Sequence, residues 1–371
     1  MPVRVKDITA VMETYFPLYL AESWDNVGLQ IGSVNKVIER VVIALDVDER
    51  ILEYAIKQKA DMIISHHPLL FKPLNNICYD LMTGKLIRDI VLSHIAIYCA
   101  HTNLDAADKG LNQLLAELLG IKNIEPLDTY KSEGLYKLVI YVPAAYVNEV
   151  RAAVNKAGAG YTGNYSDCSF RVQGTGTFCP GPNTEPYIGT MGNLQEVDEY
   201  RLETVVYRND LPRILRVMQE VHPYEEIAYD IYPLINEGKT YSIGRKGFLE
   251  EKMSLKEYSL EVKKRLGIER IRVVGELDRE IEKIAVVCGS GASFINKVID
   301  QGIDLLVTGD LKYHEAKEAE AQDLSIIDAG HQETEKIVIP YLCNLLADEC
   351  RARDMQIELI EAYPAACFKT L

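Results

Sequence analysis

Apolar and polar positions alternate in a regular way in the first third of the chain. Residues 41–45 form a run rich in β-branched side chains and residues 62–64 form a second apolar run, and both predict strands buried on two faces. Between them, residues 49–59 place apolar side chains at helical spacing. The order strand, helix, strand favours a parallel sheet, because the helix returns the chain to the end of the sheet at which the first strand began.

The same pattern returns in the last third of the chain. Strands are expected at residues 284–287 and 305–307, with a helix at residues 293–301. Residues 61–67 align with residues 304–310, which places Asp310 opposite His67. We interpret the chain as two related α/β halves that form one fold and bring their strand ends to one crevice. Chance similarity of two βαβ units is the alternative.

Residues 128–237 lie between the halves and are richer in Tyr and Gly. Strands are expected at residues 135–142, 169–177, 202–207 and 227–232, and helices at residues 147–157 and 211–221. This β-α-β-β-α-β order is typical of ferredoxin-like domains, so we predict an inserted ferredoxin-like α+β domain. Residues 1–127 and 238–371 would then form the main α/β domain. Gly and Pro in 174–176 and 179–182 favour a protruding loop there.

Composition narrows the class of protein. With 40 basic and 55 acidic residues, the net charge of −15 argues against nonspecific binding to nucleic acid or to anionic membranes. Residues 1–20 carry Asp7 and Glu13 within an apolar stretch, so neither a signal peptide nor a membrane span fits, and we expect a cytoplasmic protein. The eight cysteines include no C-x-x-C pair and are expected to be reduced packing residues rather than zinc ligands.

Two segments far apart in the chain end alike. Each runs from an apolar stretch into a histidine that is followed four residues later by a carboxylate: His101 and Asp105 in one, His331 and Glu335 in the other. Four residues make about one helical turn, so both groups of a pair point the same way if a helix begins at the histidine. Imidazoles and carboxylates gathered at strand ends outline a metal site.

The doublet His66-His67 ends another apolar run, just before Pro68, where the chain turns and both rings can approach one cavity. Five side chains form the predicted site: His66, His67, Asp105, His331 and Glu335. Imidazole and carboxylate ligands without thiolates suit zinc first, with manganese or iron as alternatives. Five ligands exceed the need of one tetrahedral ion, so we predict two divalent metal ions sharing a bridging carboxylate, an arrangement that favours hydrolysis.

Two further histidines are candidate catalytic proton donors. His101 matches His331 in the internal repeat, and it is a further ligand, a donor that orients Asp105, or a core histidine. His314 follows the strand end of the second copy, where it is expected to hydrogen-bond into the cavity or to contact a substrate.

Two loops have open interpretations. Asp25 and Asn26 follow Trp24, the only tryptophan, and they either line the cavity or form a local turn. Residues 289–293, Gly-Ser-Gly-Ala-Ser, follow a strand and open a helix, so they either bind a phosphate or make a tight turn for packing.

Together these segments resemble the Nif-three-like family, whose bacterial members are named GTP cyclohydrolase 1 type 2 homologs. The resemblance is carried by residues 24–29, 64–69, 101–105, 307–310 and 330–335. It implies an α/β fold with a dinuclear metal site at the five residues named above, a homohexamer, and the long bacterial form whose insert resembles PII or CutA domains. The tail, residues 362–369, differs from the usual family ending.

Two classes of function follow. The first is a metal-dependent hydrolase of a nucleotide-like small molecule, either a GTP cyclohydrolase that opens the guanine imidazole ring or a phosphoesterase. The second is a non-enzymatic metal-binding ring protein whose insert senses a ligand or docks a partner. Analysis of the products formed from GTP and from phosphoesters would separate these classes.

Overall fold

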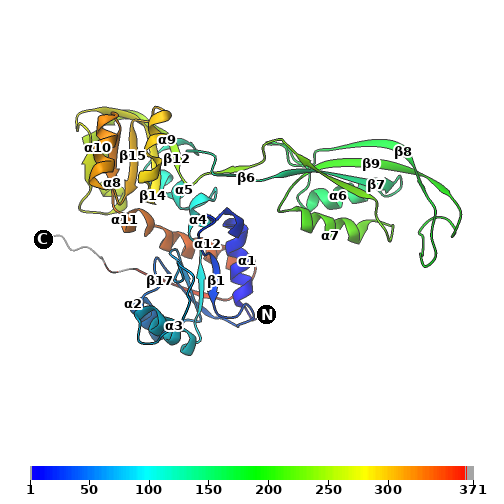
Figure 1. Ribbon diagram of the computed structural model, residues 1–371, viewed down its shortest axis with the longest axis horizontal. Helices are drawn as coiled ribbons and strands as arrows, with labels where there is room; N and C mark the ends of the chain where they lie inside the picture. Colours follow the sequence, from blue (N-terminus) through cyan, green and yellow to red (C-terminus); the bar gives the residue numbers. More distant parts are fainter. Residues whose placement is uncertain (1, 364, 366–371) are drawn as a thin grey trace. The chain divides into compact units, whose positions relative to one another are not determined.

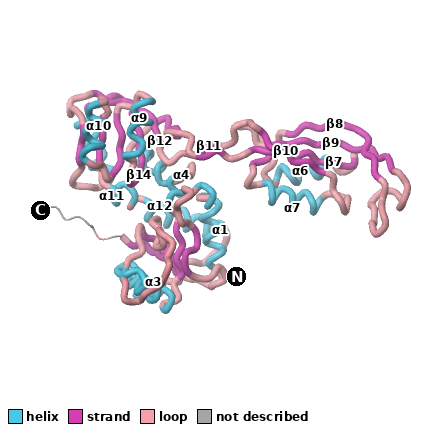
Figure 2. Tube along the Cα trace, viewed as in Figure 1, coloured by secondary structure: helices cyan, strands magenta, loops and turns pink. Residues whose placement is uncertain are grey.

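The computed structural model describes residues 2–363 and residue 365 of the chain. It divides into two compact units, of which unit 1 comprises Met1–Tyr130 with Tyr241–Leu371 and unit 2 comprises Lys131–Thr240. Figure 1 labels the helices and strands, and Figure 2 distinguishes them by colour. Unit 1 is therefore built from both ends of the chain, with unit 2 inserted between them.

The first sheet of unit 1 has five strands in the order β1-β4-β3-β2-β17. Its strands are β1 (Gly28–Ile31), β2 (Arg40–Ala44), β3 (Met62–Ser65), β4 (Ala96–Cys99) and β17 (Glu358–Ala362). The parallel arrangement predicted from the sequence is present in β2, β3, β4 and β17, and β1 is an antiparallel edge. The C-terminal part of the chain thus completes a sheet that begins near the N-terminus.

The second sheet has six strands in the order β13-β16-β15-β14-β12-β5. Its strands are β5 (Lys122–Pro126), β12 (Arg245–Ser254), β13 (Arg272–Val274), β14 (Glu280–Ser290), β15 (Leu305–Gly309) and β16 (Ser325–Asp328). The central strands β14, β15 and β16 are parallel, and the outer pairings are antiparallel. Both sheets therefore contain three parallel strands that neighbour one another in chain order.

Helices surround both sheets of unit 1. They are α1 (Val5–Tyr15), α2 (Glu49–Lys57), α3 (Met82–Leu92), α4 (Thr102–Ala106), α5 (Leu111–Leu118), α8 (Leu255–Leu266), α9 (Ile295–Asp300), α10 (Tyr313–Ala321), α11 (His331–Glu335) and α12 (Val338–Ala352), with 3-10 turns η1 (Leu18–Leu20) and η2 (Ala292–Phe294). The helix predicted at 293–301 is thus a 3-10 turn followed by a short α-helix. Among the described residues, no helix has the length and apolar content that crossing a membrane requires.

The parallel strands are buried on both faces. In β2, Val41 and Ile43 belong to a core that also includes residues of the second sheet and of α12, whereas Val42 and Ala44 belong to a separate cluster with residues of α2 and α3. The second sheet repeats this alternation against α9 and α10. Burial on both faces explains why the central parallel strands contain continuous apolar runs in the sequence.

Unit 2 has its own sheet and its own core. Its elements are β7 (Leu135–Pro143), α6 (Val147–Lys156), β8 (Ser169–Phe178), β9 (Gln195–Tyr207), α7 (Leu211–Val221) and β10 (Tyr229–Leu234), with short strands β6 (Lys131–Ser132) and β11 (Thr240–Tyr241) at its ends. The sheet order is β10-β7-β9-β8, and all three pairings are antiparallel. Helices α6 and α7 cover one face (Figure 1), where Ile140, Val150 and Ile214 pack together.

The predicted protruding loop begins later than the sequence suggested. Residues 174–176 continue β8, with Gly174 opposite Glu199 and Gly176 opposite Val197 in β9, so the expectation of a loop at these glycines is wrong. Glycine keeps its backbone donor and acceptor, and pairing with the long strand β9 holds it extended despite its low strand propensity. Only residues 179–194 form the loop.

The cysteines of the described chain are free, as predicted, but Cys78 and Cys179 are exposed, so the expectation of packing residues is wrong for these two. They are Cys78, Cys99, Cys168, Cys179, Cys288, Cys343 and Cys350. Cys367 and most of the tail, residues 364 and 366–369, lie outside the described residues.

Candidate metal centre

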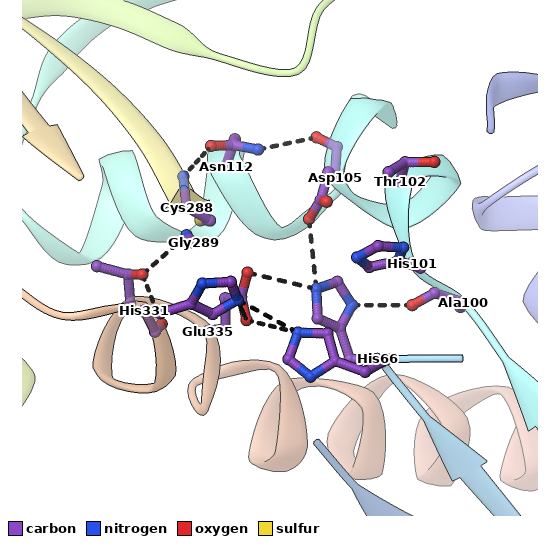
Figure 3. Close-up of polar contacts among 12 residues, drawn as sticks. His66, Ala100, His101, Thr102, Asp105, Asn112, Cys288, Gly289, His331 and Glu335 are labelled. Carbon is purple, nitrogen blue, oxygen red and sulfur yellow. Dashed lines mark hydrogen bonds and ion pairs between the residues drawn. The ribbon is translucent and has the colours of Figure 1, made fainter. Parts of the chain in front are cut away.

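Strand ends of both sheets in unit 1 deliver the predicted ligands to one place (Figure 3). His66 and His67 follow β3, and the Ser65 hydroxyl donates to the His67 carbonyl at 2.8 Å, which stabilises the turn before Pro68. His101 follows β4 and caps helix α4. The turn predicted just before Pro68 is therefore present and presents both rings of the doublet.

The second half supplies its ligands in the same manner. After β16, Gly330 has a φ of 92°, a conformation that glycine adopts without strain, and it turns the chain directly into α11. His331 begins this helix and Glu335 ends it, and the His331 Nε2 atom lies 3.1 Å from Glu335 Oε2. The expectation that a helix begins at this histidine and aligns it with the carboxylate is confirmed.

Every histidine of the cluster has its Nδ1 atom occupied. In the first half, His66 Nδ1 donates to the Ala100 carbonyl at 2.9 Å, and His67 Nδ1 pairs with Asp46 Oδ1 at 2.7 Å. Donation from Nδ1 leaves Nε2 as the nitrogen that carries the lone pair. Such partners are the usual means by which proteins orient metal-binding imidazoles.

The other two histidines follow the same rule. His331 Nδ1 pairs with Asp310 Oδ2 at 2.7 Å, and His101 Nδ1 pairs with Asp25 Oδ1 at 3.0 Å. The Asp25 carboxylate also accepts from the backbone N–H of Thr102 at 3.0 Å, and the N–H of Asp25 donates to the Glu22 carbonyl at 3.1 Å, so Asp25 both contacts the cluster and closes a local turn. The two interpretations of this loop are therefore compatible.

The free Nε2 atoms and carboxylates converge. Two sets have ligand atoms within 4.8 Å of one another, one formed by His66, His67 and His101 and the other by His67, His331 and Glu335. His67 Nε2 and His331 Nε2 lie 3.4 Å apart, although they come from different halves of the sequence. His101 thus stands beside the predicted ligands and is available as one of them.

Glu335 occupies the middle of the cluster, between the rings of His331 and His66 (Figure 3). Its Oε1 atom is 3.8 Å from His66 Nε2, and its Oε2 atom is 3.0 Å from His67 Nε2. Asp105 Oδ1 lies 3.7 Å from the same His66 nitrogen. One carboxylate therefore faces imidazoles on both sides.

Several of these atoms lack hydrogen-bond partners. His66 Nε2, Asp105 Oδ1 and Glu335 Oε2 are buried and have no hydrogen bond to any described residue; Glu335 Oε2 meets its imidazoles at ion-pair distances only. Leaving buried polar atoms unpaired costs about 1–3 kcal/mol each. Divalent cations bound within the cluster would satisfy such atoms, so the residues present fit a metal site.

Charges within the cluster raise the pKa values of His67 and His331. Burial disfavours the charged ring, but contacts with Asp46 and Glu335 outweigh it and raise the pKa of His67 to about 10. Contact with Glu335 is the main cause that raises the pKa of His331 to about 9, with help from Asp310 and against burial. Without a metal ion, protons on these two rings neutralise the carboxylates.

The pKa values of the two buried carboxylates are shifted in opposite directions. Burial raises the pKa of Asp105, and the charge of His66 only partly offsets it. Burial acts on Glu335 as well, but its imidazole neighbours, His331 foremost, hold the pKa of Glu335 well below its usual value. Glu335 is therefore the fixed negative charge of the cluster.

The glycine loop at 289–293 packs against the site rather than presenting free N–H groups. Gly289 has a φ of 61°, and a Cβ atom there would lie 2.2 Å from Glu335 Oε1. Its N–H donates to Thr334 Oγ1 at 3.0 Å, and the N–H of Gly291 donates to Thr308 Oγ1 at 2.8 Å. These contacts favour the tight turn over the phosphate site.

Sequence reasoning overlooked one partner and left another residue open. It did not identify Asp46, although a polar residue directly after the apolar run 41–45 was the signal that could have indicated it. His314 is exposed on the first turn of α10, where its ring lies 5.3 Å from that of Tyr313. Its catalytic role stays a prediction.

Comparison with known proteins supplies the family. The model of the family described as Duf34/NIF3 (NGG1p interacting factor 3) matches residues 3–365. The chain belongs to this family. The resemblance inferred from the sequence motifs is therefore confirmed.

Relatives match along most of their length. A protein of Halalkalibacterium halodurans, named GTP cyclohydrolase 1 type 2 homolog, is 43% identical over 331 residues, 89% of either chain. A protein of Bacillus subtilis with the same name is 40% identical over 357 residues, 96% of this chain and 95% of the relative. The crystal structure of a Bacillus cereus protein related to NIF3 has a TM-score of 0.93 at 40% identity and covers all of both chains.

Proposed function

We propose that this protein binds two divalent metal ions and uses them to hydrolyse a nucleotide-like small molecule. The observation that carries the proposal is the position of Glu335, whose two oxygens face His66 on one side and His67 with His331 on the other. A single ion bound on one side of Glu335 would leave the imidazole or imidazoles on the other side without a metal partner. Two ions that share the Glu335 carboxylate engage all of them.

The residues divide between the two positions. His66, Asp105 and Glu335 Oε1 would hold one ion, with His101 available as a further ligand. His67, His331 and Glu335 Oε2 would hold the other. When bound, such a pair supplies an activated water and polarises the bond under attack. We propose zinc as the preferred ion, with manganese or iron as alternatives, because the ligands are imidazoles and carboxylates.

The protein's own side chains would then position the reaction. Asp46, Asp310 and Asp25 fix the rings of three histidines through their Nδ1 atoms, so each Nε2 stays aimed at the cluster. His101 remains a candidate proton donor. Trp24, which is 55% exposed and has its ring 6.0 Å from that of His101, supplies an aromatic surface beside the centre on which a nucleobase could stack.

The nucleotide-like substrate rests on the relatives' name, GTP cyclohydrolase 1 type 2 homolog, together with the metal cluster. Within the enzyme class, a phosphoesterase would use the same ions to stabilise attacking and leaving oxygens. A second candidate is a metal-binding protein without catalysis whose insert binds a ligand, and the cavity in unit 2 described below favours it.

The proposal also covers the fold of the insert, the oligomeric state and the location of the protein. We propose that residues 128–237 are a ferredoxin-like domain of the PII or CutA kind, since the sheet order β10-β7-β9-β8 and the two helices on one face fit that pattern. The resemblance to the family supports a homohexamer, and the acidic composition agrees with a cytoplasmic protein that binds neither membranes nor nucleic acid nonspecifically.

Metal content and product analysis test the proposal. Protein purified from its own host should contain about two equivalents of zinc, manganese or iron by elemental analysis. The metal-replete protein should convert GTP to a ring-opened or pterin product, or release phosphate from a phosphoester. Asp105→Asn should abolish turnover, whereas Asp300→Asn, an exposed aspartate of α9, should leave it unchanged. Two bound ions with no turnover of any substrate would reject the hydrolase and support the binding role.

A further inference from the structure

Unit 2 contains a cavity of about 430 Å³. It lies where β8 and β9 meet the loop of residues 179–194, and the segment after α7 closes its other side. This volume is in the range of small-molecule binding sites. Nothing in the metal cluster of unit 1 takes part in it.

Four aromatic residues contribute to the walls of this cavity: Tyr141, Phe178, Tyr187 and Tyr224. The ring centroids of Phe178 and Tyr224 are 5.9 Å apart, and those of Tyr187 and Tyr224 are 6.3 Å apart. The hydroxyl of Tyr187 hydrogen-bonds that of Tyr146 at 2.7 Å, which fixes the ring although Tyr187 is 52% exposed. The faces of such rings carry partial negative charge.

A buried carboxylate lies among these rings. Glu199 is 8% exposed, and its Oε1 atom accepts a hydrogen bond from the Tyr224 hydroxyl at 2.9 Å. A Cβ atom on Gly176 would lie 2.1 Å from Glu199 Oε2, so the glycine makes the space that the carboxylate occupies. Two further glutamates and neither Lys nor Arg contribute to the lining, which is drawn from described residues. The cavity is therefore both aromatic and negatively charged.

The loop that covers the cavity is held in place. Both oxygens of the Glu225 carboxylate accept from the backbone N–H of Glu185, at 3.0 and 3.2 Å. The Thr184 hydroxyl donates to the Gly181 carbonyl at 2.9 Å. A site formed in advance loses less entropy when a ligand binds.

We propose that this cavity binds an organic cation, an alkylated ammonium group attached to an apolar body. The aromatic faces attract such a cation, and Glu199 supplies the opposing charge. A phosphate or carboxylate ligand would meet three glutamates and no Lys or Arg in this lining. A divalent metal ion fits less well, because much of the lining is aromatic or aliphatic and Glu225 already accepts backbone hydrogen bonds. This inference goes beyond the proposed hydrolase and does not depend on it.

Calorimetric titration of the full-length, metal-replete protein tests the proposal. The probes are choline, benzyltrimethylammonium and dimethylbutanol, the last being the uncharged carbon isostere of choline. The two cations should bind at least about tenfold more tightly than the alcohol, as a desolvated cation–π contact provides. Glu199→Gln should weaken choline binding about tenfold, and Glu196→Gln, an exposed glutamate of the same strand, should not change it.

A second variant keeps the test decisive if the buried substitution Glu199→Gln prevents the protein from folding. Tyr187→Leu removes a half-exposed ring and should weaken choline binding several-fold, whereas Tyr232→Leu, an exposed tyrosine of β10 outside the cavity, should not. Equal affinity for choline and the alcohol would overturn the proposal. So would the absence of cation binding at millimolar concentration, equal effects of the paired variants, or a site that prefers Mg²⁺ or Mn²⁺ to choline.

Discussion

The metal cluster of unit 1 and the cavity of unit 2 both contain a buried carboxylate, but its neighbours differ. Glu335 is surrounded by the Nε2 atoms of three imidazoles, and the Nδ1 atom of each of these rings is already hydrogen-bonded. Glu199 is surrounded by aromatic rings and one tyrosine hydroxyl. Lone pairs aimed at one point suit a small, hard cation, whereas ring faces suit a large, soft one. Under the two proposals, the neighbours of each carboxylate therefore determine which cation it would bind.

Substitution of the bridging carboxylate is expected to have the largest effect. Glu335→Gln removes the charge that both metal positions share, so the affinity for zinc should fall by more than about a hundredfold and turnover should be lost. Elemental analysis after dialysis measures the first effect. Glu333→Gln, on the same helix but paired with Lys336, is the matched control. Two retained ions in Glu335→Gln would contradict the bridging role, and choline binding in unit 2 should be unaffected.

Acidification is expected to weaken metal binding in unit 1 alone. His67 and His331 have pKa values raised to about 10 and about 9, so the metal-free protein carries protons there at neutral pH and metal must displace them. Affinity should fall by up to about a hundredfold for each unit of pH below these values, for two displaced protons. Titrations in buffers of different ionisation enthalpy count the protons, and a count of zero would contradict the assignment.

The same shifts act on the stability of the metal-free protein. Because the pKa values of His67 and His331 are higher in the folded chain, their contribution to the free energy of unfolding is complete below about pH 6.5. It is lost as the pH rises through 9 to 10. In denaturant unfolding of the metal-free protein, the part of the free energy of unfolding that these two histidines contribute should therefore decrease from neutral to alkaline pH. The metal-loaded protein serves as the comparison.

Removal of a supporting carboxylate should have a smaller effect. Asp46→Asn keeps the size of the side chain but weakens its hold on His67 Nδ1, and loss of such partners typically costs 10- to 100-fold in metal affinity. Competition with a chromophoric chelator measures this change. The exposed variant Asp300→Asn should leave the affinity unchanged, and an equal loss in both variants would show that the effect is not specific to His67.

The smallest expected effect is on choline binding when Gly176, in the lining of the unit 2 cavity, is substituted. Gly176→Ala places a methyl group against the Glu199 carboxylate and should weaken choline binding about threefold to tenfold without changing metal content. Gly174→Ala, on the same strand, meets no atom within 4 Å and is the matched control. If both variants bind choline like the wild type, Glu199 does not form part of the cation site.

The metal cluster was predictable because its residues are few and their positions are distinctive. A histidine that ends an apolar run and precedes a carboxylate by one helical turn occurs twice, and the structure contains both turns, at α4 and α11. The aspartates that orient the rings were harder to find. Asp46 and Asp310 hydrogen-bond histidines that lie 21 residues away in the chain, so only the folded sheets bring each pair together.

The cavity of unit 2 could not be predicted from sequence. Tyrosines and glutamates are common in this segment, and Phe178, Glu199 and Tyr224 meet only because three elements converge. The strand predicted at 169–177 matches β8, but the expectation of a protruding loop at the glycines 174–176 was wrong, since low strand propensity is overcome when β9 pairs along the whole strand. The sheet edges β17 and β5 were also missed, because they join sheets built from distant parts of the chain.

The number of ions at Glu335 tests the central claim most directly. Crystals grown with zinc, measured with anomalous scattering at the zinc edge, should show two peaks about 3.5–4 Å apart with one Glu335 oxygen directed at each. His66 should lie beside one peak, and His67 and His331 beside the other. A single peak that Glu335 does not contact, or none, would contradict the account.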